Sequence, residues 1–264
     1  MQIRLMAVKK NMKSKLFVVT GGSSGFGRAV VQTLLEKNHF VISLSRSLIL
    51  KKEVEMFGPN FFQFKVDFSK PFSSATGNFL NKSFSKINLK NVDQVCLINN
   101  AAVINPVDRI ENLFEKEIQK HIQVNLAAPI AMTQVFLKAT SLFKGPRIVV
   151  QLTSGAAMRA VEGWALYCAS KAGLSMFNQV LTLQNRQDQN FKAILYSPGI
   201  MDTPMQKNIR SVKKSQFPQI EEFKHFKKRN QLKAPEVVAD DLIRILSDFS
   251  KIESGQTYRV SETN

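Results

Sequence analysis

Short apolar runs alternate with longer amphipathic segments along the chain, and this alternation limits the possible folds more than any other feature. Apolar runs of strand length predict strands buried on both faces, and the amphipathic segments predict helices that cover a sheet. The pattern therefore predicts an α/β fold with a doubly wound parallel sheet of about seven strands and helices on both faces. The expected strands are residues 15–20, 40–45, 61–67, 92–99, 147–153, 192–197 and 257–261.

The expected helices cover residues 26–38, 72–85, 113–138, 167–185 and 235–249. Pro235 suits the first turn of the last helix, where a missing N–H costs nothing. No repeat or low-complexity linker interrupts the pattern. We therefore expect residues 14–264 to form one domain, preceded by a basic extension over residues 1–13.

Residues 206–232 break the alternation. They are rich in Lys, Gln and Glu, and they carry Phe217 and Phe223. The segment follows the sixth expected strand and so falls outside the carboxyl ends of the sheet, where ligands of such sheets bind. We expect a lid over a substrate pocket, with a plain surface helix as the alternative.

A glycine-rich turn, TGGSSGFG, follows the first expected strand and precedes the first helix. Its glycines Gly21, Gly25 and Gly27 permit a tight turn and a close approach of the backbone to a pyrophosphate. The helix N-terminus offers free N–H groups and the positive end of its dipole. The turn predicts a dinucleotide site, and a purely structural turn is the alternative.

The second expected strand ends in SLSRS, which places Ser45 where an NAD site would carry a carboxylate for the ribose 2′-hydroxyl. Arg46 follows directly. A guanidinium pairs with a 2′-phosphate, whereas a carboxylate would repel it. This arrangement favours NADP(H), and a solvent-facing arginine is the alternative.

Tyr167 and Lys171 lie four residues apart in an expected helix, so they share one face. The phenol of a free tyrosine has a pKa near ~10. A nearby ammonium and a cationic nicotinamide would stabilise the phenolate and lower that pKa. Ser154 ends the expected strand RIVVQLTS, where its hydroxyl can face a substrate carbonyl. These residue types suit proton transfer to a carbonyl oxygen.

The ordered set of motifs resembles the short-chain dehydrogenase/reductase family over roughly residues 14–205. The motifs are TGGSSGFG, NNAA (99–102), Asn125, Ser154, YCASK and SPGIMDTPM (197–205). The resemblance implies a Rossmann-type fold and an NADP-dependent carbonyl reductase, which acts on CH–OH donors in the reverse direction. It also implies a homodimer or homotetramer that associates through the helices at 113–138 and 167–185.

The resemblance further implies roles for individual residues. Tyr167 would be the general acid, with Ser154 hydrogen-bonding the carbonyl oxygen, Lys171 orienting the ribose, and Asn125 holding a water in a proton relay. Cofactor contacts would come from Gly21, Ser23, Ser24, Phe26, Gly27, Arg46, Asp67, Phe68, Asn99, Ala101, Tyr167, Lys171, Pro198, Gly199, Ile200 and Thr203.

Two positions depart from the family pattern. Ala102 replaces a usual glycine, which is tolerable where the backbone needs no positive φ. Ser24 stands where many NADP-dependent members carry a basic residue, so Arg46 bears the phosphate preference alone.

Within the family the chain is most similar to the branch of sepiapterin reductases and benzil reductases that form (S)-benzoin. The stretches GWALYCASKAGL, SPGIMDTPMQ and SGQTYRVSE carry this likeness. It implies a vicinal dicarbonyl or α-hydroxyketone as substrate. Trp164, Phe217 and Phe223 would suit a flat or apolar substrate, with core packing as the alternative for all three. Glu262 falls near the place of an acidic anchor, and a solvated terminal acid is its alternative.

Charge and cysteine content bear on other classes of function. The formal net charge is +17, but the Lys and Arg residues are spread along the chain without a nucleic-acid motif, so we expect no nucleic-acid partner. No apolar stretch approaches the ~20 residues of a membrane span. Cys96 and Cys168 lack metal-ligand spacing, so we expect no metal site. We expect both cysteines to be free thiols, as in a protein of the cytoplasm. A catalytically idle NADP(H)-binding sensor or interaction protein of the same fold is the main rival hypothesis.

Overall fold

The computed structural model describes all residues except 1–13, 72–83, 85–86, 88 and 262–264. The expected helix at 72–85 therefore falls almost wholly outside the described residues. Glu262 and the basic extension over residues 1–13 lie outside them as well.

The described strands form one parallel sheet with the order β3-β2-β1-β4-β5-β6-β7. The strand order reverses at β1, the mark of a doubly wound sheet, so the predicted fold class is confirmed. Every expected strand is present to within two residues of its predicted ends. The strands are β1 (Ser14–Thr20), β2 (Phe40–Ser45), β3 (Phe61–Lys65), β4 (Val92–Asn99), β5 (Arg147–Leu152), β6 (Phe191–Ser197) and β7 (Thr257–Arg259).

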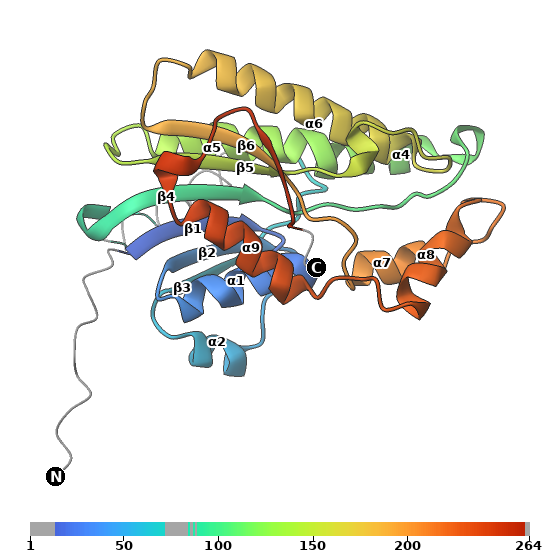
Figure 1. Cartoon of the computed structure of the whole chain (residues 1–264), viewed down its shortest axis with the longest axis horizontal. Coiled ribbons are helices and arrows are strands. Elements are labelled where there is room, and N and C mark those ends of the chain that lie inside the picture. The colour runs from blue at the N-terminus through green and yellow to red at the C-terminus, as the bar shows by residue number, and fades with distance from the viewer. Residues whose placement is uncertain (1–13, 72–83, 85–86, 88, 262–264) are drawn as a thin grey trace, which may run out of the picture.

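Helices cover both faces of this sheet, with α1, α2 and α9 on one side and α4, α5 and α6 on the other (Figure 1). Pro235 lies in the first turn of α9, as predicted. The helices described are α1 (Gly25–Glu36), α2 (Lys51–Phe57), α4 (Glu115–Ile122), α5 (Ala128–Ala139), α6 (Ala165–Gln184), α7 (Pro204–Ile209), α8 (Ile220–Lys228) and α9 (Pro235–Leu246).

Alternate residues of each strand pack into two separate cores. Phe17 and Val19 of β1 face the side of α1 and α9, whereas Leu16 and Val18 face the side of α5 and α6. All four are almost completely buried. Strands buried on both faces lose alternation and read as continuous apolar runs, which explains why the runs predicted them well.

The segment predicted as one helix at 113–138 contains a local distortion. A π turn at Gln123–Ala127 separates α4 from α5, and it contains Asn125. Pro129 contributes to this break because it has no N–H to donate to the carbonyl four residues earlier. The π turn was not predicted, and such turns often mark functional sites.

Helices α7 and α8 lie beyond the carboxyl ends of the strands, on the opposite side of the molecule from η5 (Phe249–Lys251) (Figure 1). Residues 206–209 of α7 and all of α8 fall within the segment 206–232 expected as a lid. The short helix α2 was not predicted, because none of its residues is buried and its pattern is therefore weak. None of the described helices is long and apolar enough to cross a membrane.

Candidate active site

The glycine turn adopts a shape that side chains would prevent. Gly21 and Gly25 have φ values of 72° and 51°, in the left-handed region that favours glycine. A Cβ on Gly27 would lie 2.2 Å from the carbonyl oxygen of Gly21. The N-cap of α1, Ser24, makes no side-chain cap hydrogen bond, and the first turn contains no acidic residue. The turn thus presents helix N–H groups without a competing carboxylate, as an anion site requires.

Two residues that the sequence analysis missed hold this turn in place. The Asn100 side chain donates to the carbonyl oxygens of Thr20 and Gly21 at 2.9 and 3.2 Å. The Thr20 hydroxyl accepts hydrogen bonds from the backbone N–H groups of Asn100 and Ala101, both at 3.0 Å. Strands β1 and β4 are neighbours, so these bonds tie the turn to the adjacent strand end.

Arg46 and Asp67 lie at neighbouring strand ends beside the turn. Arg46 is exposed and follows the buried Ser45, whose hydroxyl donates to Ser47 O at 3.0 Å. Hydrogen bonds from Ser69, with a smaller contribution from the charge of Arg46, lower the pKa of Asp67. An accessible guanidinium therefore stands at the place predicted for a 2′-phosphate.

The other predicted cofactor residues fall into a buried group and an accessible or half-buried group. Phe26, Phe68 and Asn99 are buried, so their side chains belong to the core. The Asn99 amide nitrogen donates to Pro129 O and to Thr133 Oγ1, and its Oδ1 is buried without a hydrogen-bond partner in the part of the chain that the structure describes. The accessible or half-buried members are Ser23, Ser24, Ala101, Pro198, Gly199, Ile200 and Thr203. Ala102 has no positive φ, so the alanine is tolerated there.

Ser154, Tyr167 and Lys171 come together where β5 ends against α6. Ser154 caps the short turn Gly155–Ala157, with its hydroxyl accepting from Ala156 N at 3.2 Å, and it hydrogen-bonds Tyr167. The Lys171 ammonium lies 5.6 Å from the centre of the Tyr167 ring and donates to Leu152 O at 2.8 Å. The predicted constellation of these three residues is therefore present in space.

The pKa of Tyr167 was expected to be lowered by an ammonium together with a cationic nicotinamide, and in the chain by itself it is raised instead. Burial raises the pKa of Tyr167 to about 12, against the smaller opposite effect of its hydrogen bond to Ser154. Burial also lowers the pKa of Lys171 to about 8. The low-polarity surroundings disfavour both charged forms. Tyr167 is therefore held protonated, as a proton donor must be.

Asn125 lies within the π turn and is almost completely buried. Its Oδ1 accepts from Val103 N at 2.8 Å, and its Nδ2 donates to Val103 O at 2.7 Å. Its Nδ2 also lies 2.8 Å from His121 Nε2. These bonds use both amide hydrogens and one of the two lone pairs of Oδ1, which leaves the side chain little capacity to hold a water. A role in a proton relay would fall to its main-chain carbonyl.

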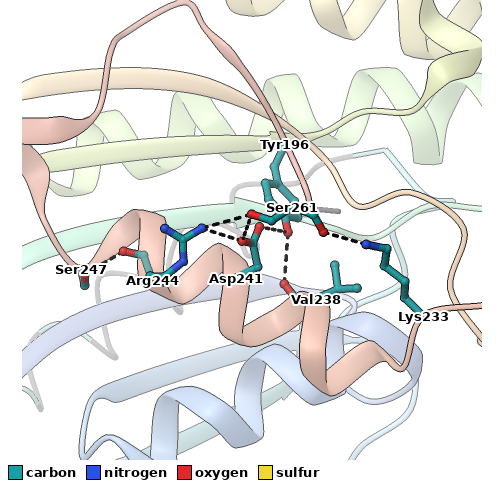
Figure 2. A network of polar contacts seen from close by, with 7 residues as sticks. All are labelled: Tyr196, Lys233, Val238, Asp241, Arg244, Ser247 and Ser261. Carbon is teal, nitrogen blue, oxygen red and sulfur yellow. Dashed lines mark hydrogen bonds and ion pairs between the residues drawn. The ribbon is translucent and has the colours of Figure 1, made fainter. Parts of the chain in front are cut away.

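A polar network around Asp241 anchors the chain behind the loop Pro198–Thr203. Figure 2 shows Tyr196, at the end of β6, with its hydroxyl donating to Asp241 Oδ2 at 2.9 Å. Arg244 and the Ser261 hydroxyl donate to Asp241 Oδ1 at 2.7 and 3.0 Å. The network thereby joins β6, α9 and the segment after β7.

Lys233 extends this anchoring to the loop itself. Its backbone N–H donates to Ile200 O at 3.1 Å, and its carbonyl accepts from Asp202 N at 3.0 Å. Its ammonium donates to Ser261 O at 2.7 Å (Figure 2). The loop predicted to cradle the nicotinamide is therefore held from two directions.

An aromatic cluster covers Tyr167. Trp164 stacks on Phe217 with ring centres 5.1 Å apart, and it meets Tyr167 edge-on at 5.6 Å. Phe223 packs on both Trp164 and Phe217. Gln216 donates to Asp108 at 2.7 Å, which ties the segment 206–232 to the loop after β4. The three aromatic residues predicted to line the pocket therefore lie together beside the predicted acid, and they also pack as a core.

Metal and disulfide chemistry receive no support in the described part of the chain. No group of three or more His, Cys, Asp or Glu side chains there could hold a metal ion. Cys96 and Cys168 are free thiols, and burial raises the pKa of Cys96.

Known proteins match this chain over most of its length. The sequence model of the short chain dehydrogenase family matches residues 15–214. The benzil reductase ((S)-benzoin forming) of Bacillus subtilis (strain 168) is 34% identical over 249 residues, covering 94% of this chain and 99% of that protein. Sepiapterin reductase of Bos taurus is 28% identical over 253 residues, covering 91% and 92%.

A solved structure agrees with these relatives. The crystal structure of a short chain dehydrogenase/reductase from Saccharomyces cerevisiae superposes with a TM-score of 0.79 and 28% identity, covering 94% of this chain and 97% of that one. The predicted resemblance to this family, and to its benzil and sepiapterin reductase branch, is confirmed.

Proposed function

The chain belongs to the short chain dehydrogenase family, and from this premise we propose that it is an NADPH-dependent carbonyl reductase. The observation that carries the proposal is the meeting of Ser154, buried Tyr167 and Lys171 beside the carboxyl edge of the sheet. A ketone reductase needs a protonated donor next to the carbonyl oxygen, and Tyr167 is such a donor.

The residues of the cofactor site fit a dinucleotide phosphate. The glycine turn leaves room for a pyrophosphate against the N-terminus of α1, because Gly21, Gly25 and Gly27 carry no side chains. Arg46 is placed to pair with a 2′-phosphate, and no carboxylate takes the place of Ser45. The loop Pro198–Thr203 would lie against the nicotinamide. When bound, the reduced nicotinamide supplies the hydride that the carbonyl carbon accepts.

The chain's own residues supply the proton and the orientation. Ser154 and Tyr167 are hydrogen-bonded to each other, so both hydroxyls can face one carbonyl oxygen. Tyr167 gives its proton to that oxygen as negative charge develops there. Lys171 is held by Leu152 O, and its remaining N–H groups can bind the ribose and stabilise the tyrosinate left after proton transfer.

We propose a vicinal dicarbonyl or an α-hydroxyketone as the substrate. Two considerations support this class: the likeness to benzil and sepiapterin reductases, and the flat aromatic surfaces of Trp164, Phe217 and Phe223 around Tyr167. The segment 206–232 would act as a lid, since Phe217 and Phe223 come from it and Tyr167 beneath them is only 8% exposed. Substrate entry therefore requires this segment to move.

We also propose that the enzyme is a cytoplasmic homodimer or homotetramer. The free thiols Cys96 and Cys168 suit a reducing compartment. Met176, Val180 and Leu183 are exposed along α6, one of the two helical segments expected to associate.

NADPH oxidation by the purified protein, followed with benzil and related vicinal diketones, tests the proposed function. Turnover is expected with the diketones. Tight NADPH binding without turnover across the panel would favour the alternative, an idle NADP(H)-binding sensor. A third hypothesis, nucleic-acid binding, rests on the net charge alone. A protein that binds DNA through charge would retard DNA in a gel-shift assay, and rising salt would abolish that binding.

The indole N–H of Trp164 provides a specific test of the substrate class. It is buried and finds no acceptor in the part of the chain that the structure describes. A second substrate oxygen would supply one. Trp164→Phe should therefore lower kcat/KM for benzil about tenfold, the loss of one hydrogen bond, and leave deoxybenzoin, which lacks that oxygen, nearly unchanged.

Phe217→Leu is the matched control for this prediction, because it alters the same aromatic stack without removing a donor. It should lower kcat/KM for both ketones alike. If the ratio of kcat/KM for benzil to kcat/KM for deoxybenzoin were unchanged in Trp164→Phe, the indole N–H would not bind the second oxygen.

A further inference from the structure

His121 is a fully buried residue to which the proposed function assigns no role. It lies near the end of α4, four residues before Asn125, and its exposed fraction is 0%. Its Nδ1 lies 2.9 Å from Asn105 O, and its Nε2 lies 2.8 Å from Asn125 Nδ2. Its ring also meets Tyr167 edge-on, with centres 6.3 Å apart. The histidine thus touches two residues of the candidate site.

The partners of His121 determine which ring nitrogen carries the proton. A backbone carbonyl only accepts, so Nδ1 must carry the hydrogen that bonds to Asn105 O. The Asn125 amide cannot be reversed, because its Oδ1 accepts from Val103 N and its Nδ2 donates to Val103 O. The second hydrogen of Nδ2 therefore points at Nε2, which must be unprotonated. The contacts require a neutral ring with its hydrogen on Nδ1.

A protonated His121 would be incompatible with this arrangement. An N–H on Nε2 would face the Nδ2 hydrogens of Asn125, two donors without an acceptor between them. The charged group that faces the ring is Lys171, and the other titratable group is Tyr167, both on α6. Burial first, and the positive charge of Lys171 second, lower the pKa of His121, against the opposing hydrogen bond to Asn105. The neutral ring is thus favoured at neutral pH.

We propose that His121 is a positioning residue whose neutral Nδ1–H form holds Asn125 and the π turn in place beside Tyr167, and whose protonation releases them and stops reduction. The functional half of this inference rests on the proposed reductase activity. The structural half, the state of the ring and its bond to Asn125, does not. The sign of the pH effect follows directly: activity persists above the pKa of His121 and falls as the pH drops through it.

Two substitutions distinguish the hydrogen bond that His121 accepts from Asn125 from the ability of His121 to become charged. His121→Gln retains a carbonyl acceptor at similar reach but cannot become charged, whereas His121→Leu removes the acceptor. With benzil, kcat in His121→Leu should fall about tenfold with little change in KM, the cost of one lost buried hydrogen bond. His121→Gln should retain most of kcat at neutral pH and lose the acid-side decline seen in the wild type. An unchanged kcat in His121→Leu, or an acid-side decline that persists in His121→Gln, would overturn the proposal.

Nitrogen NMR of the wild-type protein labelled at histidine gives a readout that needs no substrate. The chain has only three histidines, and the signal absent from His121→Gln assigns the one of interest. We expect the Nδ1–H tautomer and a titration midpoint below the ordinary pKa of 6.5. An Nε2–H tautomer, or a ring charged at neutral pH, would refute the structural half even if no ketone is reduced. The predicted tautomer in a protein without turnover would instead contradict the proposed function alone.

Discussion

Tyr167→Phe should abolish carbonyl reduction while leaving NADPH binding intact. The substitution removes the hydroxyl hydrogen-bonded to Ser154 and keeps the ring packed under Trp164. General acids contribute roughly 10²–10⁴-fold to rate. The buried phenol of Tyr196, which pairs with the end of β5, packs in the core with α9 and donates to Asp241, so a loss at the upper end of that range is expected for kcat of Tyr167→Phe. NADPH affinity, measured by fluorescence titration, should change little.

Tyr258→Phe is the matched control for this prediction. Tyr258 lies on β7 and its hydroxyl accepts from Glu253 N, away from the aromatic cluster over Tyr167. The control should keep wild-type kcat. If Tyr167→Phe retained more than about a tenth of wild-type kcat, another group would have to supply the proton and the proposed role would be wrong.

Arg46→Asp should reverse the cofactor preference. Removing the guanidinium deletes a charge-assisted pair with the 2′-phosphate, and the new carboxylate repels that phosphate and can hold a ribose 2′-hydroxyl. Hydrogen bonds between charged groups contribute ~1.5–3 kcal/mol, so the NADPH-to-NADH ratio of kcat/KM should fall by about 100-fold. Steady-state kinetics with both cofactors at low and high salt measures this ratio.

Arg186→Asp makes the same charge change on an exposed arginine just after α6 and should leave the ratio near its wild-type value. An Arg46→Asp enzyme with the same preference as the wild type would show that the 2′-phosphate is not bound by Arg46. Added salt should weaken the wild-type preference, because an exposed ion pair is screened.

Sequence patterns predicted the frame of the fold because each feature is local. Strands such as β1 and β4 are buried on both faces and therefore read as uninterrupted apolar runs. The glycine turn can be recognised in the sequence because Gly21 and Gly25 have φ values that other residues avoid. The Tyr167–Lys171 spacing predicted a shared helix face, and α6 supplies it.

Features that depend on distant contacts escaped prediction. Asn100 reaches back to Thr20 and Gly21 across neighbouring strands, and nothing in its own segment signals that contact. The raised pKa of Tyr167 depends on an aromatic cover supplied in part by residues 206–232. The π turn at Asn125 left one signal in the sequence, Pro129 inside an otherwise helical stretch.

Transfer of deuterium is the most direct test of the central claim that this chain moves a hydride from NADPH to a ketone with Tyr167 as the proton donor. Purified protein would be given benzil and NADPH deuterated at both hydrogens of the reactive nicotinamide carbon, and the product analysed by mass spectrometry. The wild type is expected to form benzoin carrying a single deuterium on carbon, and Tyr167→Phe is expected to form none. Saturable NADPH binding without labelled benzoin, or equal label from Tyr167→Phe, would contradict it.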